Sequence, residues 1–446
     1  MRESIDTRSL APGDLFFAIR SETGDGHDHL ARAFAAGAGA AVVAGERAAE
    51  GAAFGPVFAV DDTLRAMERL GLAARARSAA RIVAVTGSVG KTSAKDMLRV
   101  ALGAAGPTHA AAASYNNHWG VPLTLARMPA GSAFGVFEIG MNHAGEIAPL
   151  VAMVRPHVAL VTTIAPVHIE HLGSIEAIAD AKAEIFSGVE PGGAIVLNRD
   201  APQFERLAAQ ARGTGRAVAT FGAGAGADGR LLDYQAEGEG ARVRAEINGR
   251  ILVFTLGAPG LHMAQNAVGV LLAVRALGAD PGAAAEALAG FSAPKGRGAR
   301  HVLQAAGGAF TLIDESYNAN PVSMRAALAL LGATAPGPGG RRIAALGDML
   351  ELGAGAAQAH AGLADELVRH RVDLLYCAGP LMRGLYDAAP AAMRAAWAPR
   401  SAELAGGVLD APRAGDVVMI KGSNGSAMAP IVAALRVRFS ASGSGG

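Results

Sequence analysis

One stretch decides the fold of this chain: Val85-Thr86-Gly87-Ser88-Val89-Gly90-Lys91-Thr92-Ser93. The apolar run before it, Ile82 to Val85, is typical of a buried strand, and the residues after it, Lys95 to Leu102, have helical spacing. A strand, a glycine-rich turn and a helix form the setting in which backbone N–H groups cradle phosphate oxygens. Lys91 would then reach the outer phosphates, and the hydroxyl of Thr92 would bind Mg²⁺.

The match to the phosphate-binding pattern G-x-x-x-x-G-K-[ST] is partial, because Val85 stands where the first glycine is expected. The alternative is a tight turn whose lysine is only solvated. The strand and the helix on the two sides of the turn favour the phosphate loop.

The composition indicates several compact domains. Of 446 residues, 51% are hydrophobic and 18% are charged, which is enough apolar material for several cores. The length favours two to four domains. Lys and Arg number 40 against 39 Asp and Glu, a formal charge of +1, so the overall charge indicates no nucleic-acid partner.

Three features bear on the compartment. The single cysteine, Cys377, allows no internal disulfide and suits a reducing cytosol. The first residues, Met1 to Asp6, contain no apolar run and do not resemble a signal peptide. No stretch approaches the roughly 20 uninterrupted apolar residues of a membrane span. We therefore expect a cytoplasmic protein without a membrane span.

Alternating strand and helix signals predict an α/β protein of three domains. Residues 1–81 form a small α/β unit, residues 82–297 a larger unit with a mostly parallel sheet, and residues 298–439 a Rossmann-like unit. The second boundary is placed at the basic, glycine-rich link Pro294 to Arg300. The last unit lacks G-x-G-x-x-G, which disfavours dinucleotide binding, and residues 440–446 are expected to be a flexible tail.

Two charged residues stand out from apolar surroundings. Glu138 ends the apolar run that begins at Phe134, which places it near the end of a strand, where open α/β sheets bind ligands. Lys182 shares helical spacing with Ile178 and Ile185 and therefore faces inward. A buried lysine requires an anion, a metal-linked group or a route by which its ammonium reaches water.

Several further segments resemble the Mur ligases of peptidoglycan synthesis, and the resemblance extends over nearly the whole chain. They are Thr86–Thr92, Asn116–Pro122, Glu138–Ile147, Ala181–Phe186, Ser316–Pro321, Leu346–Gly353 and Lys421–Ser423. The phosphate loop is common to the superfamily. Ser316-Tyr317-Asn318-Ala319-Asn320-Pro321 and Leu346-Gly347-Asp348-Met349-Leu350-Glu351-Leu352-Gly353 are similar to segments of the member that adds D-alanyl-D-alanine.

The resemblance implies a three-domain, ATP-dependent amide ligase. Its substrates would be ATP, UDP-N-acetylmuramoyl-tripeptide and D-alanyl-D-alanine, and we expect a monomer. ATP would phosphorylate the terminal carboxylate of the tripeptide, and the amine of D-alanyl-D-alanine would displace phosphate from the acyl phosphate. This route needs cations around the transferred phosphoryl group and a closed site that excludes water.

The resemblance also implies the residues that bind each group. The nucleotide would be held by Gly87, Ser88, Val89, Gly90, Lys91, Thr92, Ser93, Asn266, Arg297 and either Asp314 or Glu315. Two Mg²⁺ ions would be bound by Thr92, Glu138, His168 and Lys182, the last as a carbamate. Lys91, Lys182, His168 and Arg297 would be the catalytic set. The substrate-binding residues would be Thr7, Arg8, His27, Asn116, Asn117, Asn318, Asn320, Lys421 and Ser423.

Two other interpretations remain open. The first is a sister ligase that adds an amino acid to a UDP-muramoyl dipeptide or glutamate to folate. The second is a P-loop switch or transport ATPase, against which stand the partial glycine-rich pattern and the inward Lys182.

Overall fold

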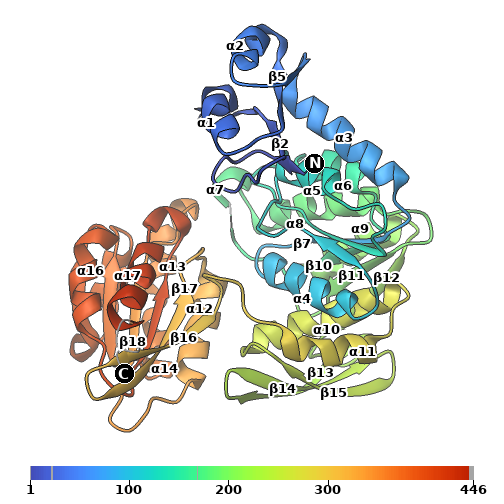
Figure 1. Cartoon of the computed structure of the whole chain (residues 1–446). Helices are drawn as coiled ribbons and strands as arrows, with labels where there is room; N and C mark the ends of the chain where they lie inside the picture. The colour runs from blue at the N-terminus through green and yellow to red at the C-terminus, as the bar shows by residue number, and fades with distance from the viewer. Residues whose placement is uncertain (1, 22–23, 168, 441–446) are drawn as a thin grey trace, which may run out of the picture.

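The computed structural model describes residues 2–21, 24–167 and 169–440. Three large sheets of four, nine and six strands follow one another along the chain, and a two-stranded ribbon lies in the first part. Figure 1 shows the three parts as dark to light blue, light blue through green to yellow, and orange to red, and we call their sheets the N-terminal, central and C-terminal sheets. The expected α/β class is confirmed.

The N-terminal sheet is small and entirely parallel, in the order β1-β2-β5-β6. Its strands are β1 (Glu3–Ser4), β2 (Leu15–Phe17), β5 (Ala40–Ala44) and β6 (Val57–Val60), and the ribbon is β3 (Arg20–Ser21) with β4 (Gly24–Asp25). Its helices are η1 (Gly26–His29), α1 (Leu30–Ala35), η2 (Gly45–Arg47), α2 (Ala48–Ala52) and α3 (Thr63–Arg77). Helix α3 begins where the Asp62 side chain accepts from the Arg65 amide, a standard N-cap.

The central sheet carries the phosphate loop. Its strands are β7 (Arg81–Thr86), β8 (Thr108–Ala110), β9 (Phe134–Glu138), β10 (Val158–Val161), β11 (Ala194–Asn198), β12 (Ala217–Gly222), β13 (Gly229–Glu237), β14 (Gly240–Ile247) and β15 (Arg250–Leu256). The order is β15-β14-β13-β12-β11-β10-β7-β9-β8. The strands are parallel except for the antiparallel pairs β13–β14 and β14–β15. Asn248 and Gly249, with φ of 47° and 83°, form the turn between β14 and β15, as the Asn-Gly pair predicts.

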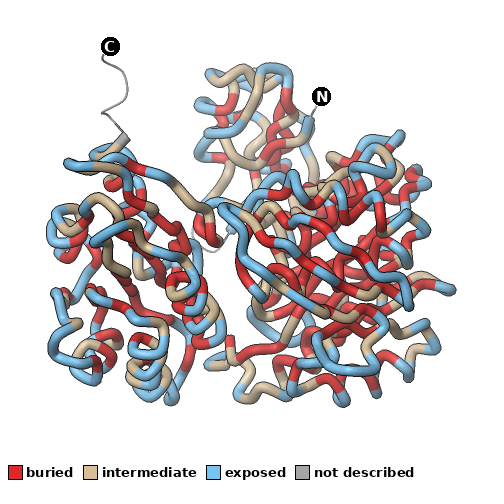
Figure 2. Tube along the Cα trace, turned by 90° about the horizontal axis from the view of Figure 1, so that it is seen from below, coloured by how far each residue is buried: buried red, intermediate tan, exposed pale blue. Residues whose placement is uncertain are grey.

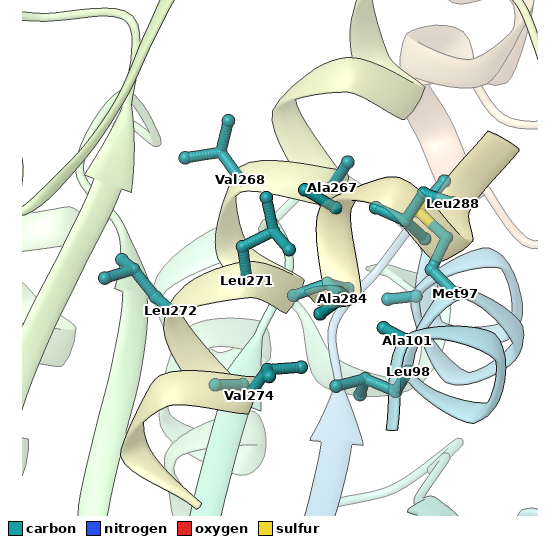
Figure 3. Packing of buried hydrophobic residues seen from close by; sticks show 14 of the residues in the cluster. Met97, Leu98, Ala101, Ala267, Val268, Leu271, Leu272, Val274, Ala284 and Leu288 are labelled. Carbon is teal, nitrogen blue, oxygen red and sulfur yellow. The ribbon is translucent and has the colours of Figure 1, made fainter. Parts of the chain in front are cut away.

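Helices cover both faces of the central sheet and bury it. One face packs against α4 (Lys91–Gly103), α10 (Leu261–Ala276) and α11 (Pro281–Ala287), whose apolar side chains interlock in Figure 3. The other packs against α5 (Gly120–Ala126), α6 (Ile147–Val154), α8 (Ile175–Ala183) and α9 (Phe204–Gly213). Figure 2 shows the buried chain running through this part. Strands covered on both faces read as continuous apolar runs, which is why β7, β9 and β11 were recognisable in the sequence.

The C-terminal sheet has the order β16-β17-β21-β18-β19-β20 and is parallel except between β16 and β17. Its strands are β16 (Ala299–Ala305), β17 (Gly308–Glu315), β18 (Arg342–Gly347), β19 (Leu374–Ala378), β20 (Arg394–Ala398) and β21 (Val417–Lys421). Its helices include α12 (Pro321–Ala333), α13 (Ala356–Ala361), α14 (Ala364–Arg369), α15 (Met382–Ala388), α16 (Ser401–Asp410) and α17 (Ala429–Ser440). Apolar clusters lie on both faces of this sheet.

The N-terminal part is tied to the central part by buried cations. The guanidinium of Arg75, on α3, donates to the carbonyls of Val154 and Arg155 at the end of α6. Arg127 donates to the carbonyl of Glu3. These bonds cap carbonyls that would otherwise be left without partners, so the two parts are joined through side chains as well as through the chain.

Two helices differ from their expected bounds. The apolar stripe through Lys182 predicts a helix reaching Val189, but α8 ends at Ala183 and a tighter turn, η3 (Glu184–Gly188), follows. The helical signal over 360–370 predicts one helix, but this stretch contains the end of α13 and the whole of α14, with Gly362 between them. Periodicity shows which residues face inward, whereas the ends depend on backbone bonds that it does not reveal.

Candidate active site

Two glycines shape the phosphate loop between β7 and α4. Gly87 has a φ of 145°, and a Cβ there would lie 2.0 Å from the hydroxyl oxygen of Thr162. Gly90 has a φ of 87°, and a Cβ there would lie 2.6 Å from the side-chain nitrogen of Asn266. Both positions combine a left-handed backbone with close neighbours, so only glycine fits. Gly90 also precedes the first residue of α4, which places the loop at a helix N-terminus.

The neighbouring strand β10 holds the loop in place. The Ser88 amide donates to the carbonyl of Thr163 at 2.8 Å, and the Ser88 hydroxyl donates to the carbonyl of Ala165 at 3.0 Å. The Thr162 hydroxyl donates to the carbonyl of Val89 at 2.6 Å. Strands β10, β7 and β9 are adjacent and parallel, so the groups at their carboxyl ends meet at one edge of the sheet.

Lys91 lies across the loop. Its Nζ donates to the carbonyl of Gly87 at 2.7 Å. Burial lowers the pKa of the ammonium, the charge of Glu138 opposes that shift, and the charge of Arg297 adds to it. A buried ammonium of this kind is stabilised by an anion, and a phosphate bound on the loop would supply one.

The Glu138 carboxylate is buried at the end of β9, 2% exposed. One oxygen accepts from the Thr92 hydroxyl at 2.9 Å and the other accepts from the Asn116 side chain at 2.7 Å. Thr92 and Glu138 therefore bring two oxygen donors to one place beside the phosphate loop. Mg²⁺ is usually bound by one or two carboxylates, waters and substrate phosphates, so this pair fits it even though the described residues contain no cluster of three acidic, His or Cys ligands.

Lys182 is buried, 1% exposed, as its apolar stripe predicts. Burial lowers the pKa of its amine well below the usual range, and the nearby charge of Lys91 lowers it further. The two lysines thus lie close enough to repel each other. His168, expected as a metal ligand, lies outside the described residues.

The phosphate loop opens into a cavity of about 360 Å³ between the central and C-terminal sheets, which we call the main cavity because the phosphate loop lines it. The central part contributes loop residues together with Asn116, Glu138 and the N-terminal end of α10, and the C-terminal part contributes Glu315, Tyr317 and Lys421. Arg297, from the link between the two parts, lines the same cavity, and its guanidinium carbon lies 4.0 Å from the centre of the Tyr317 ring. Residues from three distant stretches of sequence therefore surround one space.

The two acidic residues at the end of β17 have different surroundings. Asp314, 1% exposed, accepts from the Ser316 hydroxyl at 2.6 Å and from the Gly296 amide at 3.1 Å, and it is not among the residues that line the cavity. Glu315 lines the cavity and accepts from Lys421 Nζ at 3.2 Å. The geometry therefore assigns the cavity-facing position to Glu315.

A second cavity, of about 570 Å³, lies where the N-terminal sheet meets the central part. Its lining combines aromatic side chains with cations: Ile5, Asp6, Thr7, Arg8, Phe16, His29, Arg32, Tyr115 and Trp119. Arg8 is held by a double hydrogen bond to Asp6, with Nε and Nη2 donating. A lining that combines aromatic rings with guanidinium groups suits a planar base attached to phosphates.

Comparison with known proteins matches this arrangement. Family models for the Mur ligase middle domain and for the Mur ligase glutamate ligase domain match residues 85–274 and 296–424. The UDP-N-acetylmuramoyl-tripeptide–D-alanyl-D-alanine ligase of Escherichia coli (strain K12) is 34% identical over 433 residues, 97% of this chain and 92% of the relative. The chain belongs to the Mur ligase family. The family expected from the sequence is thereby confirmed.

Two further comparisons cover the same length. The Bacillus subtilis (strain 168) ligase of the same name is 32% identical to this Mur ligase over 431 residues, 96% of this chain and 91% of the relative. A crystal structure of MurF from Acinetobacter baumannii superposes with a TM-score of 0.83 at 28% identity, covering 97% of this chain and 93% of that one. The similarity thus includes all three sheets.

Several expected site residues of this Mur ligase have local roles. The ring of His27 is buried, with Nδ1 bonded to Asp25 and Nε2 accepting from the Ala44 amide, and it does not line the second cavity. The Asn117 side chain accepts from the Gly120 amide at the start of α5. The Ser423 hydroxyl donates to the Ala319 carbonyl and accepts from the Leu350 amide, inside the C-terminal part.

The Asn residues of the Ser316–Pro321 segment both line the main cavity. Asn320 also caps α12, exchanging hydrogen bonds with Ser323, and the Asn318 side chain accepts from the Ala319 amide. Thr7 and Arg8 line the second cavity, as the sequence predicts for a substrate site. Asn318 and Asn320 therefore line a cavity and also hold the turn before α12.

The cavity residues that were not expected as site residues include His262, Gln265 and Tyr317. His262 and Gln265 lie near Asn266 at the start of α10, and Tyr317 belongs to the C-terminal part. Burial lowers the pKa of His262, which keeps the ring neutral near pH 7. The spacing of four residues between His262 and Asn266 places both on one helix face, a signal that was available in the sequence.

Proposed function

We propose that this Mur ligase joins D-alanyl-D-alanine to UDP-N-acetylmuramoyl-tripeptide at the expense of ATP. The observation that carries the proposal is the main cavity, where Lys91, Glu138 and Arg297 face one another between two parts of the chain. Cations on both sides of a phosphate loop suit phosphoryl transfer from a nucleotide, because they stabilise the charge that develops on the transferred group.

The reaction has two steps. A carboxylate oxygen of the tripeptide attacks the terminal phosphorus of ATP, and ADP leaves, which gives an acyl phosphate. The amine of D-alanyl-D-alanine then attacks the acyl carbon, and the tetrahedral intermediate expels phosphate and a proton to give the amide. Lys91 and Arg297 bind the transferred phosphoryl group, and the surrounding walls keep water from the acyl phosphate.

Magnesium would be held on the central side of this cavity. Thr92 and Glu138 would hold the first ion, and His168 and Lys182, the latter as a carbamate, would hold the second. When bound, Mg²⁺ would supply positive charge that stabilises the transferred phosphoryl group. Burial lowers the pKa of the Lys182 amine, which favours its neutral form, and the neutral amine can add to CO₂ with release of a proton.

The carbamate has its own test. Mass spectrometry of the intact protein in bicarbonate is expected to show one added CO₂, and Lys182→Ala is expected to lose activity that small carboxylates restore. An unmodified lysine together with no rescue by carboxylates would remove this part of the proposal.

The three ligands are assigned to different parts of the chain. Residues 1–81, with Thr7 and Arg8, bind the UDP end of the acceptor, and residues 82–297 bind ATP. Residues 298–439 complete the nucleotide site with Glu315 at the ribose and bind the dipeptide beside Asn318, Asn320 and Lys421. The described residues contain no helix long and apolar enough to cross a bilayer. The monomeric state and the cytoplasmic location stay predictions.

The function is tested by a coupled phosphate-release assay in which UDP-N-acetylmuramoyl-tripeptide, ATP, Mg²⁺ and D-alanyl-D-alanine are each omitted in turn. We expect phosphate release only with all four, and a pentapeptide product. Turnover of a UDP-muramoyl dipeptide with a single amino acid, or of a folate with glutamate, would indicate a sister ligase. Strong ATP hydrolysis without any carboxylate acceptor would indicate a P-loop switch or transport ATPase.

A further inference from the structure

Arg297 is held by an aromatic ring, not by an acid. Its guanidinium carbon lies 4.0 Å from the centre of the Tyr317 ring, and among the described residues no hydrogen bond or ion pair of its side chain is found. Stacking uses the flat face of a guanidinium and leaves the N–H groups at its edge available. Since both residues line the main cavity, those N–H groups remain available to an anion on the phosphate loop.

The link that carries Arg297 is fastened to the C-terminal sheet. The Gly296 amide donates to the Asp314 side chain at 3.1 Å, the Tyr317 amide donates to the Gly296 carbonyl at 3.0 Å, and the Gly298 amide donates to the Asp314 carbonyl at 2.8 Å. Gly296 has a φ of 74°, and a Cβ there would lie 2.9 Å from the Cβ of Tyr317. The link can approach Tyr317 this closely only because residue 296 is glycine.

On its other side the link is anchored to the central part. Phe291 is buried in the apolar cluster of α4 and α10, and Ala293 packs against the same cluster. Only Pro294 and Lys295 lie between Ala293 and the first residue bonded to the C-terminal sheet. Arg297 therefore belongs structurally to the C-terminal part, although it acts beside Lys91 of the central part.

We propose that Tyr317 is a positioning residue for Arg297: its ring holds the guanidinium at the phosphate end of the cavity, so that the C-terminal part delivers this cation to the transferred phosphoryl group. The inference rests on the proposed use of ATP, and it does not depend on which amine accepts the acyl group. The ring is needed for its face, so phenylalanine serves as well as tyrosine.

The test is a double-mutant cycle of Tyr317→Leu and Arg297→Ala in the full chain, with Tyr317→Phe as the conservative variant. Tyr386→Leu is the matched control, because Tyr386 also lies under arginines, 5.9 Å from Arg383 and 6.0 Å from Arg394, but does not line the cavity. The measurements are kcat and KM in the phosphate-release assay, the affinities for ADP and for a non-hydrolysable ATP analogue, and thermal unfolding.

Because Tyr317 is 42% exposed, we expect Tyr317→Leu to lower kcat about 3- to 5-fold, the upper range of an exposed cation–π contact, with the KM for D-alanyl-D-alanine within about twofold. Binding of the ATP analogue weakens by a similar factor while ADP binding does not, because only the analogue carries the terminal phosphate. In the Arg297→Ala background, Tyr317→Leu is expected to lower kcat further by less than about twofold. Tyr317→Phe and Tyr386→Leu stay within about twofold of the unchanged chain.

Additive losses in the cycle, or a loss in Tyr317→Phe equal to that in Tyr317→Leu, would overturn the inference. The inference would also be overturned if Tyr317→Leu weakened ADP binding as much as binding of the ATP analogue. The nucleotide measurements separate this outcome from failure of the proposed function. If Tyr317 and Arg297 are coupled in nucleotide binding but the chain makes no pentapeptide, only the choice of D-alanyl-D-alanine as the amine substrate is refuted. If the chain makes pentapeptide but the losses of the two substitutions add, only the role of Tyr317 is refuted.

Discussion

The substitution Glu138→Gln separates metal binding from folding. In the structure one carboxylate oxygen accepts from Asn116 and the other from the Thr92 hydroxyl, which also lies 3.2 Å from the hydroxyl of Ser114. In the variant, the amide oxygen still accepts from Asn116. The Thr92 hydroxyl can rotate, donate to Ser114 and accept from the new amide nitrogen, so every polar group keeps a partner.

The magnitudes follow from these contacts. Glu138→Gln keeps both hydrogen bonds but loses the attraction between the carboxylate and Lys91, so we expect the free energy of unfolding to fall by about 1–2 kcal/mol. Glu138→Ala leaves the Asn116 amide without its buried partner and opens a cavity, and a loss of about 3–5 kcal/mol is expected. A neutral amide is a much weaker Mg²⁺ ligand, so activity of the Gln variant falls at least about 100-fold.

The assay pairs urea unfolding of the two variants, without nucleotide or metal, with phosphate release titrated with Mg²⁺. A Gln variant that is as stable as predicted, yet inactive at Mg²⁺ concentrations that saturate the unchanged chain, supports the role of Glu138. A Gln variant with unchanged activity and Mg²⁺ dependence, or one that unfolds as easily as Glu138→Ala, would refute the reasoning.

Three further predictions test other parts of the molecule. Gly87→Ala is expected to lower stability by about 1–3 kcal/mol, because its Cβ would lie 2.0 Å from the Thr162 hydroxyl oxygen, and Thr162→Ala is expected to restore part of the loss on thermal unfolding. Arg8→Ala is expected to raise the KM for the UDP-tripeptide about 5- to 30-fold with kcat within about twofold, as measured by initial rates; a changed kcat with the same KM would contradict the assignment. Burial lowers the pKa of His360 in the folded chain. As the pH falls, the unfolded chain therefore binds a proton at His360 at a higher pH than the folded chain does. The contribution of His360 to the free energy of unfolding is complete above about pH 6.5 and declines below it. The change His360→Gln is expected to flatten this decline by up to about 1.4 kcal/mol per pH unit in urea unfolding, and an unchanged slope would count against it.

The residues that could be read from the sequence are those whose role is local. The phosphate loop follows from glycine spacing and from the strand and helix beside it, and Glu138 follows from its place at the end of an apolar run. Lys182 was expected to face inward from periodicity alone, and it is buried. In each case the backbone pattern within about ten residues determines where the side chain points.

Other assignments needed the tertiary structure. Nothing near Asp314 and Glu315 in the sequence says which one lines the cavity; Asp314 is bonded to Gly296 and Ser316, and Glu315 is the one that lines the cavity. His27 appears as a charged loop residue, yet its ring is buried and accepts a hydrogen bond from Ala44, 17 residues away. Contacts with distant segments therefore decide which of several chemically similar side chains line a cavity.

The sequence by itself determined the α/β class, the phosphate loop and the family, because these depend on short patterns in which neighbouring residues constrain one another. Only the tertiary structure decided that Arg297 stacks on Tyr317 and that the link is hydrogen-bonded to the C-terminal sheet. These contacts join segments of the chain that no local pattern relates, and they form only when separate sheets pack around a common space.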